Sequence, residues 1–200
     1  MENMLFGKKS SPIDFIIVGL GNPGPKYADT RHNAGFIALD ALADKYGISV
    51  DRLKWKALTG DGRIGDSRVL LLKPQTFMNC SGEAVSQAMN FYKIPPERVL
   101  VMFDDISLKP GVMRIRRKGS DGGQKGMRSI IEDTDSENFP RIKLGIGDRP
   151  RDGYDLADWV LSKFTSEDRK LLDEAVARAV EAVPMIIEGK IDEAMGKFSK

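Results

Sequence analysis

Short apolar runs that alternate with helical patterns are the feature that most restricts the fold of this 200-residue chain. Apolar runs predict strands at residues 14–19, 68–72, 98–105 and 141–147, and alternation predicts another at 111–118. Apolar spacing of three and four residues predicts helices at residues 33–46, 81–93, 126–133 and 165–189. Strands interleaved with helices indicate an α/β fold, a three-layer sandwich whose twisted, mostly parallel (mixed) sheet is flanked by helices.

The chain shows no linker, repeat or low-complexity tract, so we expect one domain over residues 1–200, with residues 1–12 as a flexible N-terminal extension. Ser81 is expected near the start of its helix, and Thr165, three residues before Asp168, near the start of the last one. Pro184 is expected to kink or break the final turns of that last helix.

Composition narrows the class of protein. Cys80 is the only cysteine, which excludes an intramolecular disulfide and a thiolate zinc site and fits a reducing, cytoplasmic compartment. The first residues lack the apolar core of a secretory signal, and no apolar run is long enough to cross a bilayer. The net charge is only +2, so a nucleic-acid surface would need uneven placement of the basic residues.

The stretch "VGLGNPGPKY" spells G-x-G-x-x-G directly after the first predicted strand, as in dinucleotide-binding folds. Pro23 and Pro25 argue against that function, because each lacks a backbone N–H and disfavours helix in the residue before it. The first helical pattern begins only at about Asn33. A loop that lifts polar side chains such as Asn22 above the sheet edge fits better.

His32 is the only histidine, and it ends this loop just before a predicted helix. Asp104 and Asp105 follow one strand and Asn79 enters a helix, so these side chains are expected at the carboxyl edge of the sheet. A carboxylate beside a histidine makes the ring a better base, and an amide can stabilise an oxyanion, which suits hydrolysis of an ester by activated water. The structural alternatives are a solvated turn for the aspartates and helix capping for Asn79.

Other chemistries fit less well. Cys80 or Ser81 as nucleophile lacks a supporting motif, and one histidine with scattered carboxylates gives no metal-ligand cluster. The stretch "RIRRKGSDGGQKGMR" concentrates cations beside glycines, which is typical of either a solvated face or a phosphate-binding surface. Arg141, Lys143, Arg149 and Arg151 are candidates to join it.

The chain resembles the bacterial peptidyl-tRNA hydrolase family over nearly its full length. The resemblance is carried by "VGLGNPGPKYADTRHNAGF", "KPQTFMNCSGEAV", "FDDISLKPG", "GSDGGQKGMRSII" and "FPRIKLGIGDRP". It implies a monomeric, cytoplasmic enzyme without a cofactor. Such an enzyme hydrolyses the ester between the peptide and the 3′-terminal ribose of tRNA, contacting the acceptor stem and CCA end. It thereby recycles tRNA from peptidyl-tRNA released prematurely by ribosomes.

The resemblance also implies residue roles. His32 matches the general base, Asp104 its carboxylate partner, and Asn22 the residue that senses the blocked amino group. Asn79 matches a substrate contact that polarises the ester carbonyl. Further matches line the peptide and adenosine groove or contact the tRNA: Tyr27, Phe77, Met78, Arg116 and Lys143.

This sequence departs from the family at Gln124 and Lys125, where the family usually has histidine and asparagine. Lys125 adds a charge that would contact the tRNA end or lower the pKa of the base. A non-catalytic RNA-binding relative of the same fold is the alternative function, with Lys125 as its only support, and a dinucleotide enzyme is a more distant one.

Overall fold

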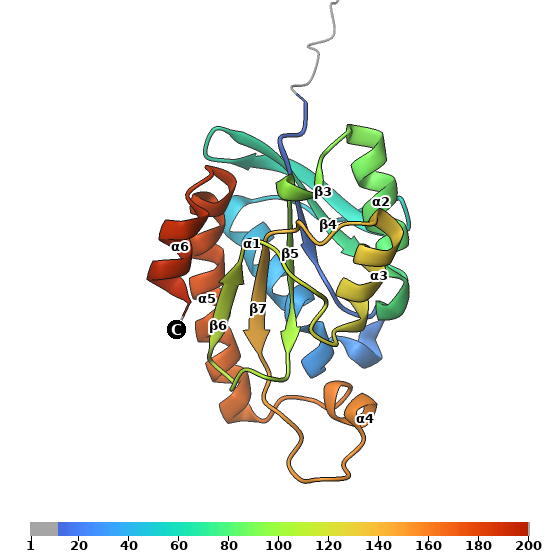
Figure 1. Cartoon of the computed structure of the whole chain (residues 1–200), viewed down its shortest axis with the longest axis vertical. Coiled ribbons are helices and arrows are strands. Elements are labelled where there is room, and N and C mark those ends of the chain that lie inside the picture. Colours follow the sequence, from blue (N-terminus) through green and yellow to red (C-terminus); the bar gives the residue numbers. More distant parts are fainter. Residues whose placement is uncertain (1–11, 200) are drawn as a thin grey trace, which may run out of the picture.

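A seven-stranded sheet runs through the structure, a computed structural model that describes residues 12–199 (Figure 1). The strands are β1 (Phe15–Gly19), β2 (Arg52–Lys54), β3 (Ala57–Ile64), β4 (Ser67–Pro74), β5 (Val99–Asp105), β6 (Met113–Arg116) and β7 (Arg141–Gly145). The helices are α1 (Ala34–Tyr46), α2 (Ser81–Tyr92), α3 (Lys125–Thr134), α4 (Leu156–Val160), α5 (Ser166–Ile187) and α6 (Ile191–Phe198). Short 3₁₀ turns are η1 (Pro25–Tyr27), η2 (Arg31–Asn33), η3 (Met78–Cys80) and η4 (Pro96–Arg98).

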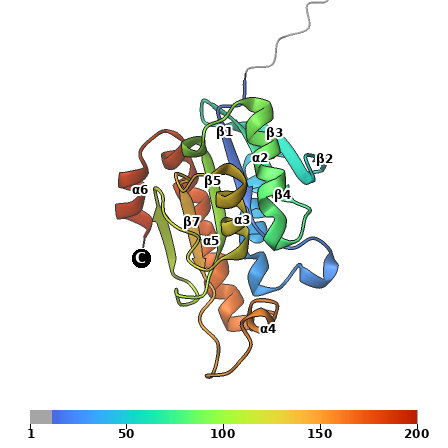
Figure 2. The same cartoon turned by 45° about the vertical axis from the view of Figure 1, so that its right-hand side comes forward.

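The strand order is β2-β3-β4-β1-β5-β7-β6. The four central strands are parallel, and both margins of the sheet are antiparallel. Helices α1, α5 and α6 cover one face, and α2 and α3 cover the other (Figures 1 and 2). The predicted α/β three-layer fold with a mixed sheet is therefore confirmed.

Strand β1 shows why the middle strands are apolar throughout. Phe15 and Ile17 join the core under α1 and α5, while Ile16 and Val18 join the core under α2 and α3. Successive side chains of a strand point to opposite faces, and here both faces are covered by helices.

The glycines after β1 and at the start of α1 allow close packing. A Cβ on Gly35 would lie 2.2 Å from the Met102 carbonyl oxygen, and a Cβ on Gly19 would lie 2.4 Å from the Gly35 oxygen. Helix α1 begins at Ala34, well beyond the glycine motif, as the prolines predicted. These glycines therefore bring α1 onto β1 and β5 and leave the loop between them to carry polar residues.

Several elements differ from the predictions. Strand β3 was not predicted, because Gly60, Asp61 and Gly62 hide its alternation. A Cβ on Gly60 would lie 2.1 Å from the Ser49 oxygen. Strand β2 and helices α4 and α6 were also not predicted, since each is too short to show a period. Of the kink or break predicted at Pro184, a break does not occur, because α5 continues to Ile187. Only the last turn follows the proline, so a single missing N–H costs the helix little.

Capping agrees in part with the predictions. The Thr165 side chain accepts a hydrogen bond from the Asp168 N–H and caps α5, as expected. Ser81 is the first residue of α2, and its hydroxyl donates to the Met78 oxygen instead of capping. The N-terminal extension expected over residues 1–12 lies outside the described residues except for Pro12. No helix within residues 12–199 is both long and apolar enough to span a membrane.

Candidate active site

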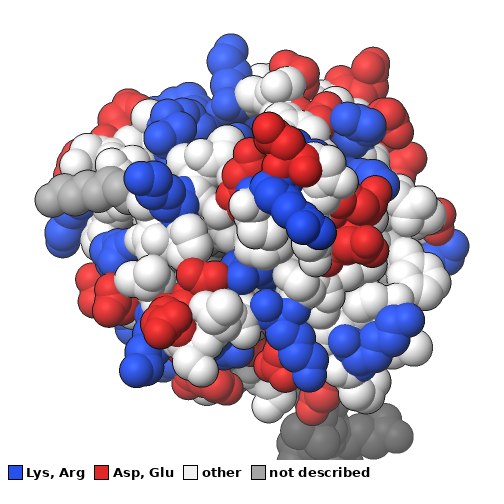
Figure 3. All heavy atoms as spheres, turned by 90° about the horizontal axis from the view of Figure 1, so that it is seen from below, with Lys and Arg blue, Asp and Glu red and all other residues white. Residues whose placement is uncertain are grey.

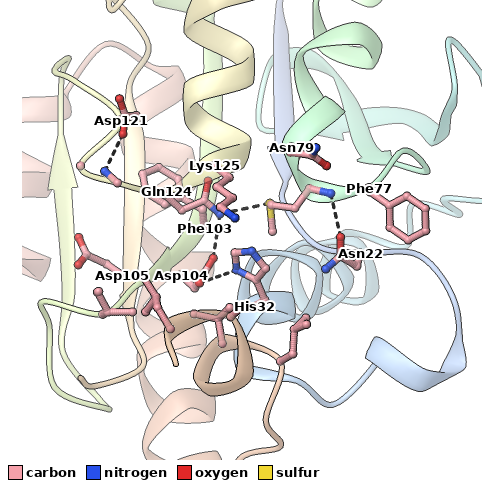
Figure 4. Close-up of a pocket in the computed structure, with 18 of the residues that line it drawn as sticks. Asn22, His32, Phe77, Asn79, Phe103, Asp104, Asp105, Asp121, Gln124 and Lys125 are labelled. Atoms are coloured by element: carbon pink, nitrogen blue, oxygen red, sulfur yellow. Dashed lines mark hydrogen bonds and ion pairs between the residues drawn. The ribbon is translucent and has the colours of Figure 1, made fainter. Parts of the chain in front are cut away.

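A pocket of about 460 Å³ opens at the carboxyl ends of the central strands (Figure 4). The loop after β1, the turn η3 after β4, the end of β5, the start of α3 and one face of α4 form its walls. The residues predicted for the site that line this pocket are Asn22, Tyr27, His32, Phe77, Met78, Asn79, Asp104 and Lys125. Arg116 and Lys143 lie outside it.

His32 and Asp104 form a buried pair in the pocket. His32 Nδ1 lies 2.8 Å from Asp104 Oδ2, and the two residues are 8% and 3% exposed. Because a carboxylate only accepts, Nδ1 carries the proton and Nε2 is left with its lone pair. Burial lowers the pKa of His32, but the charge and hydrogen bond of Asp104 raise it, and the resulting pKa lies above the ordinary value.

Asp105 has a different partner from Asp104, because neighbouring strand residues point to opposite sides. Its carboxylate pairs with Lys143 Nζ at 3.0 Å and accepts from the backbone and hydroxyl of Ser107. Burial raises the pKa of Asp105, and the bonds from Ser107 and Lys143 more than offset this, so the pKa falls below the usual range. Asp104 alone of the two aspartates is thus available to His32.

Asn22 is held in one orientation. Its Oδ1 accepts from the Met78 N–H at 2.8 Å, which leaves the Nδ2 hydrogens as the free groups. Asn33, which sequence analysis did not single out, bonds both backbone polar groups of Asn22, at 2.8 and 2.9 Å. The loop after β1 is therefore fixed at the residue that faces the pocket.

The rim of the pocket is more exposed than its floor. Met78 is buried, whereas Phe77 is 61% exposed, and Asn79 and Lys125 also face solvent. Within residues 12–199 no hydrogen bond holds the Asn79 side chain, which lines the pocket. These rim groups are free to contact a bound molecule.

Sequence analysis also left Gln124 without a role. Its side chain donates to Asp104 Oδ1 at 2.9 Å and accepts from the Met127 N–H at 2.7 Å, as the cap of α3. A polar residue just before a helical pattern is the signal that could have identified the cap. The bond to Asp104 joins residues 20 apart in sequence and left no local signal.

Arg31 joins the loop of His32 to the α4 wall. Its guanidinium lies 4.0 Å from the centre of the Trp159 ring and bonds Asp168 at 2.7 Å and the Ile146 oxygen at 3.1 Å. The Arg31 backbone N–H also donates to the Ser162 oxygen. Helix α4 contributes Leu156, Ala157 and Val160 to the pocket, and Leu161 follows directly after it. This wall was not predicted from the sequence.

The basic stretch is only partly a surface. Arg141 is 1% exposed and donates to three backbone carbonyls, those of Phe139, Ser120 and Glu137, so the expectation that it joins a phosphate-binding patch is wrong. Lys143 is neutralised by Asp105, and half-buried Arg116 donates to the Ile115 oxygen. From below, Lys and Arg side chains are interspersed with Asp and Glu (Figure 3).

The arrangement of the described residues does not support a Cys80 or Ser81 nucleophile or a metal site. Ser81 is fully buried, and neither it nor Cys80 lines the pocket. Across the described part of the chain, no three His, Cys, Asp or Glu side chains gather as metal ligands.

Comparison with known proteins identifies the family. The family model for peptidyl-tRNA hydrolase matches residues 16–200. A peptidyl-tRNA hydrolase from Caldanaerobacter subterraneus subsp. tengcongensis is 56% identical, over 92% of this chain and 99% of that protein. One from Agathobacter rectalis is 54% identical, over 92% of this chain and 100% of that protein.

The fold agrees with these sequence matches. The crystal structure of peptidyl-tRNA hydrolase from Acinetobacter baumannii superimposes with a TM-score of 0.88 at 38% identity, covering 95% of this chain and 97% of that one. This chain belongs to the peptidyl-tRNA hydrolase family.

Proposed function

We propose that His32 is the general base with which this peptidyl-tRNA hydrolase cleaves the ester between the peptide and the 3′-terminal ribose of tRNA. The observation that carries the proposal is the buried pair of His32 Nδ1 and Asp104 Oδ2, 2.8 Å apart. Asp104 holds the tautomer in which Nε2 accepts a proton, and it stabilises the imidazolium that forms.

The reaction proceeds in two steps. A water molecule gives a proton to His32 Nε2 while its oxygen bonds to the ester carbonyl carbon, which creates a tetrahedral oxyanion. The intermediate then collapses, the bond to the ribose oxygen breaks, and this leaving oxygen takes the proton from His32. The products are a peptide carboxylic acid and a tRNA with a free 3′ end. No cofactor takes part in these steps, because an ester is already an activated acyl group.

Asn22 supports the choice of substrate. With Oδ1 occupied by the Met78 N–H, Asn22 presents N–H donors to the pocket. These donors suit a carbonyl oxygen of the peptide or the oxyanion. They oppose the ammonium of an aminoacyl-tRNA, which is also a donor and is costly to desolvate. Asn79 contacts the substrate from the rim and polarises the ester carbonyl.

The remaining rim residues fit the two ends of the substrate. Tyr27, Phe77 and Met78 provide aromatic and apolar surface for the peptide and for stacking of the terminal adenosine. Exposed Lys125 supplies a cation for a phosphate of the CCA end. Arg116 is assigned to the tRNA body. Lys143 is also assigned to the tRNA body, but only the family resemblance supports this, because Asp105 already balances its charge.

The unit that acts is proposed to be a monomer, as the resemblance to the family implies. The proposed compartment is the cytoplasm, where ribosomes release the substrate. The alternative, an RNA-binding relative without activity, rested on Lys125; the intact His32–Asp104 pair offers it no support.

The test is single-turnover hydrolysis of an N-acetyl-aminoacyl-tRNA by the wild type and by His32→Ala. We expect the variant to lose about 10²–10⁴-fold in rate, the usual contribution of general-base catalysis, while tRNA binding survives. An aminoacyl-tRNA with a free amino group serves as the control substrate. An undiminished rate in His32→Ala would refute the assignment.

A further inference from the structure

Gln124 makes two side-chain hydrogen bonds that link helix α3 to the catalytic pair. We propose that Gln124 is a positioning residue: by capping α3 with its oxygen and donating its N–H to Asp104, it fixes the carboxylate that orients His32. The inference rests on the proposed function, because it assigns a role to Gln124 only through Asp104 and His32.

The cap determines which way the amide points. Gln124 Oε1 accepts from the Met127 N–H at 2.7 Å, so the oxygen is committed to the first turn of α3. Nε2 must then lie on the other side, where it is 2.9 Å from Asp104 Oδ1 and 3.2 Å from the Met78 sulfur (Figure 4). The side chain is 8% exposed, so water competes little for these bonds.

Both oxygens of Asp104 are thereby engaged. Oδ2 receives His32 Nδ1 and Oδ1 receives Gln124 Nε2. In the described part of the chain the Asp104 carboxylate has no other hydrogen-bond partner. A carboxylate held at both ends cannot rotate about its own axis, and the ring bonded to it stays at one angle. Without Gln124, the Oδ1 end would lose its only donor.

A neutral amide suits position 124 because charged side chains already surround the His32–Asp104 pair. Lys125 of α3 faces His32, while Asp121 lines the pocket and Asp105 lines it paired with Lys143. A glutamate at position 124 could accept the Met127 N–H equally well. In its ionised form, however, it could not donate to Asp104 and would bring a second negative charge to the pair.

Gln124→Glu therefore separates capping from donation. We expect this variant to lose about tenfold or more in kcat/KM for N-acetyl-aminoacyl-tRNA at neutral pH. Its melting temperature should fall as well, because a second carboxylate is buried beside Asp104. The acid limb of its kcat/KM profile should move to higher pH, since the added charge stabilises protonated His32. His32 is the only histidine, so proton NMR follows its titration directly, without reliance on activity.

Two variants complete the test. Gln87→Glu adds the same charge on the exposed face of α2 and should leave kcat/KM and the His32 titration unchanged. Gln124→Ala removes both bonds and should lower kcat/KM and the melting temperature together. If Gln124→Glu does not fold, kcat/KM and the His32 titration are measured in Gln124→Ala, and these two measurements decide.

The outcomes distinguish this inference from the proposed function. The positioning role would be overturned if Gln124→Glu had the kcat/KM and the His32 titration of the wild type while His32→Ala was inactive. Full activity of His32→Ala in the same assay would instead overturn the function on which the inference rests.

Discussion

At the scale of the residue, the basicity of His32 is set by opposing influences. Burial disfavours the imidazolium, the Asp104 carboxylate favours it, and Lys125 disfavours it again. The net effect is a raised pKa, so the neutral ring that accepts a proton predominates only above this pKa. The acid limb of kcat/KM in the free enzyme should report this titration.

Lys125 provides a test of this balance. Lys125→Gln removes a cation that repels the imidazolium, so the pKa of His32 should rise further and the acid limb should move to higher pH. The measurement is the NMR titration of His32 beside the pH dependence of kcat/KM. Arg128→Gln removes an exposed cation paired with Asp121 and is the matched control. A limb that moves to lower pH in Lys125→Gln would contradict the electrostatic argument.

At the scale of the element, helix α4 depends on contacts beyond its own five residues. So short a segment is not stable as an isolated helix. Trp159 stacks on Arg31 and donates to the Gly147 oxygen, which fixes α4 against the loop that carries His32. One buried guanidinium thus links a wall of the pocket to the loop that carries His32.

Arg31→Lys should loosen that wall. Lysine keeps the charge but cannot stack on Trp159 or bond Asp168, Ile146 and Ser162 together. We expect the free energy of unfolding to fall by about 1–3 kcal/mol and amide exchange over residues 156–161 to accelerate. Arg149→Lys changes an exposed arginine and should alter neither. Wild-type exchange over 156–161 in Arg31→Lys would show that α4 is held by other contacts.

At the scale of the whole molecule, charge is nearly balanced, with a net of +2. Lys and Arg are mixed with Asp and Glu on the end seen in Figure 3. Arg141 is buried and Lys143 is paired with Asp105, so neither is available to bind a phosphate. Binding of tRNA should therefore depend on few phosphate contacts and show a modest dependence on salt.

Arg116→Ala tests one of those contacts. The variant should raise KM more than it lowers kcat, and it should reduce the slope of log Kd for tRNA against log salt by about one. Lys45→Ala, an exposed cation on α1, is the control and should leave the slope unchanged. An unaltered KM at low salt would remove Arg116 from the tRNA surface.

Much of the fold could be predicted because each element has a local cause. The apolar run of β1 is buried on both faces, and the prolines after it delay α1 until Ala34. Strand β3 could not be predicted, because Gly60 and Gly62 are there to admit residues 48 and 49, which only the folded chain brings near. Helix α4 likewise depends on contacts of Trp159 with Arg31 and Gly147, which no local pattern shows.

The sequence by itself determined the α/β class, the carboxyl edge as the place of the site, and the candidates His32, Asp104 and Asn22. These follow from side-chain chemistry and from patterns within one element. Only the tertiary structure decided that Asp104 rather than Asp105 meets His32, that Asn22 presents its N–H groups, and that Gln124 holds the carboxylate. Those outcomes depend on hydrogen bonds between residues 20 to 72 positions apart, and their geometry exists only after packing.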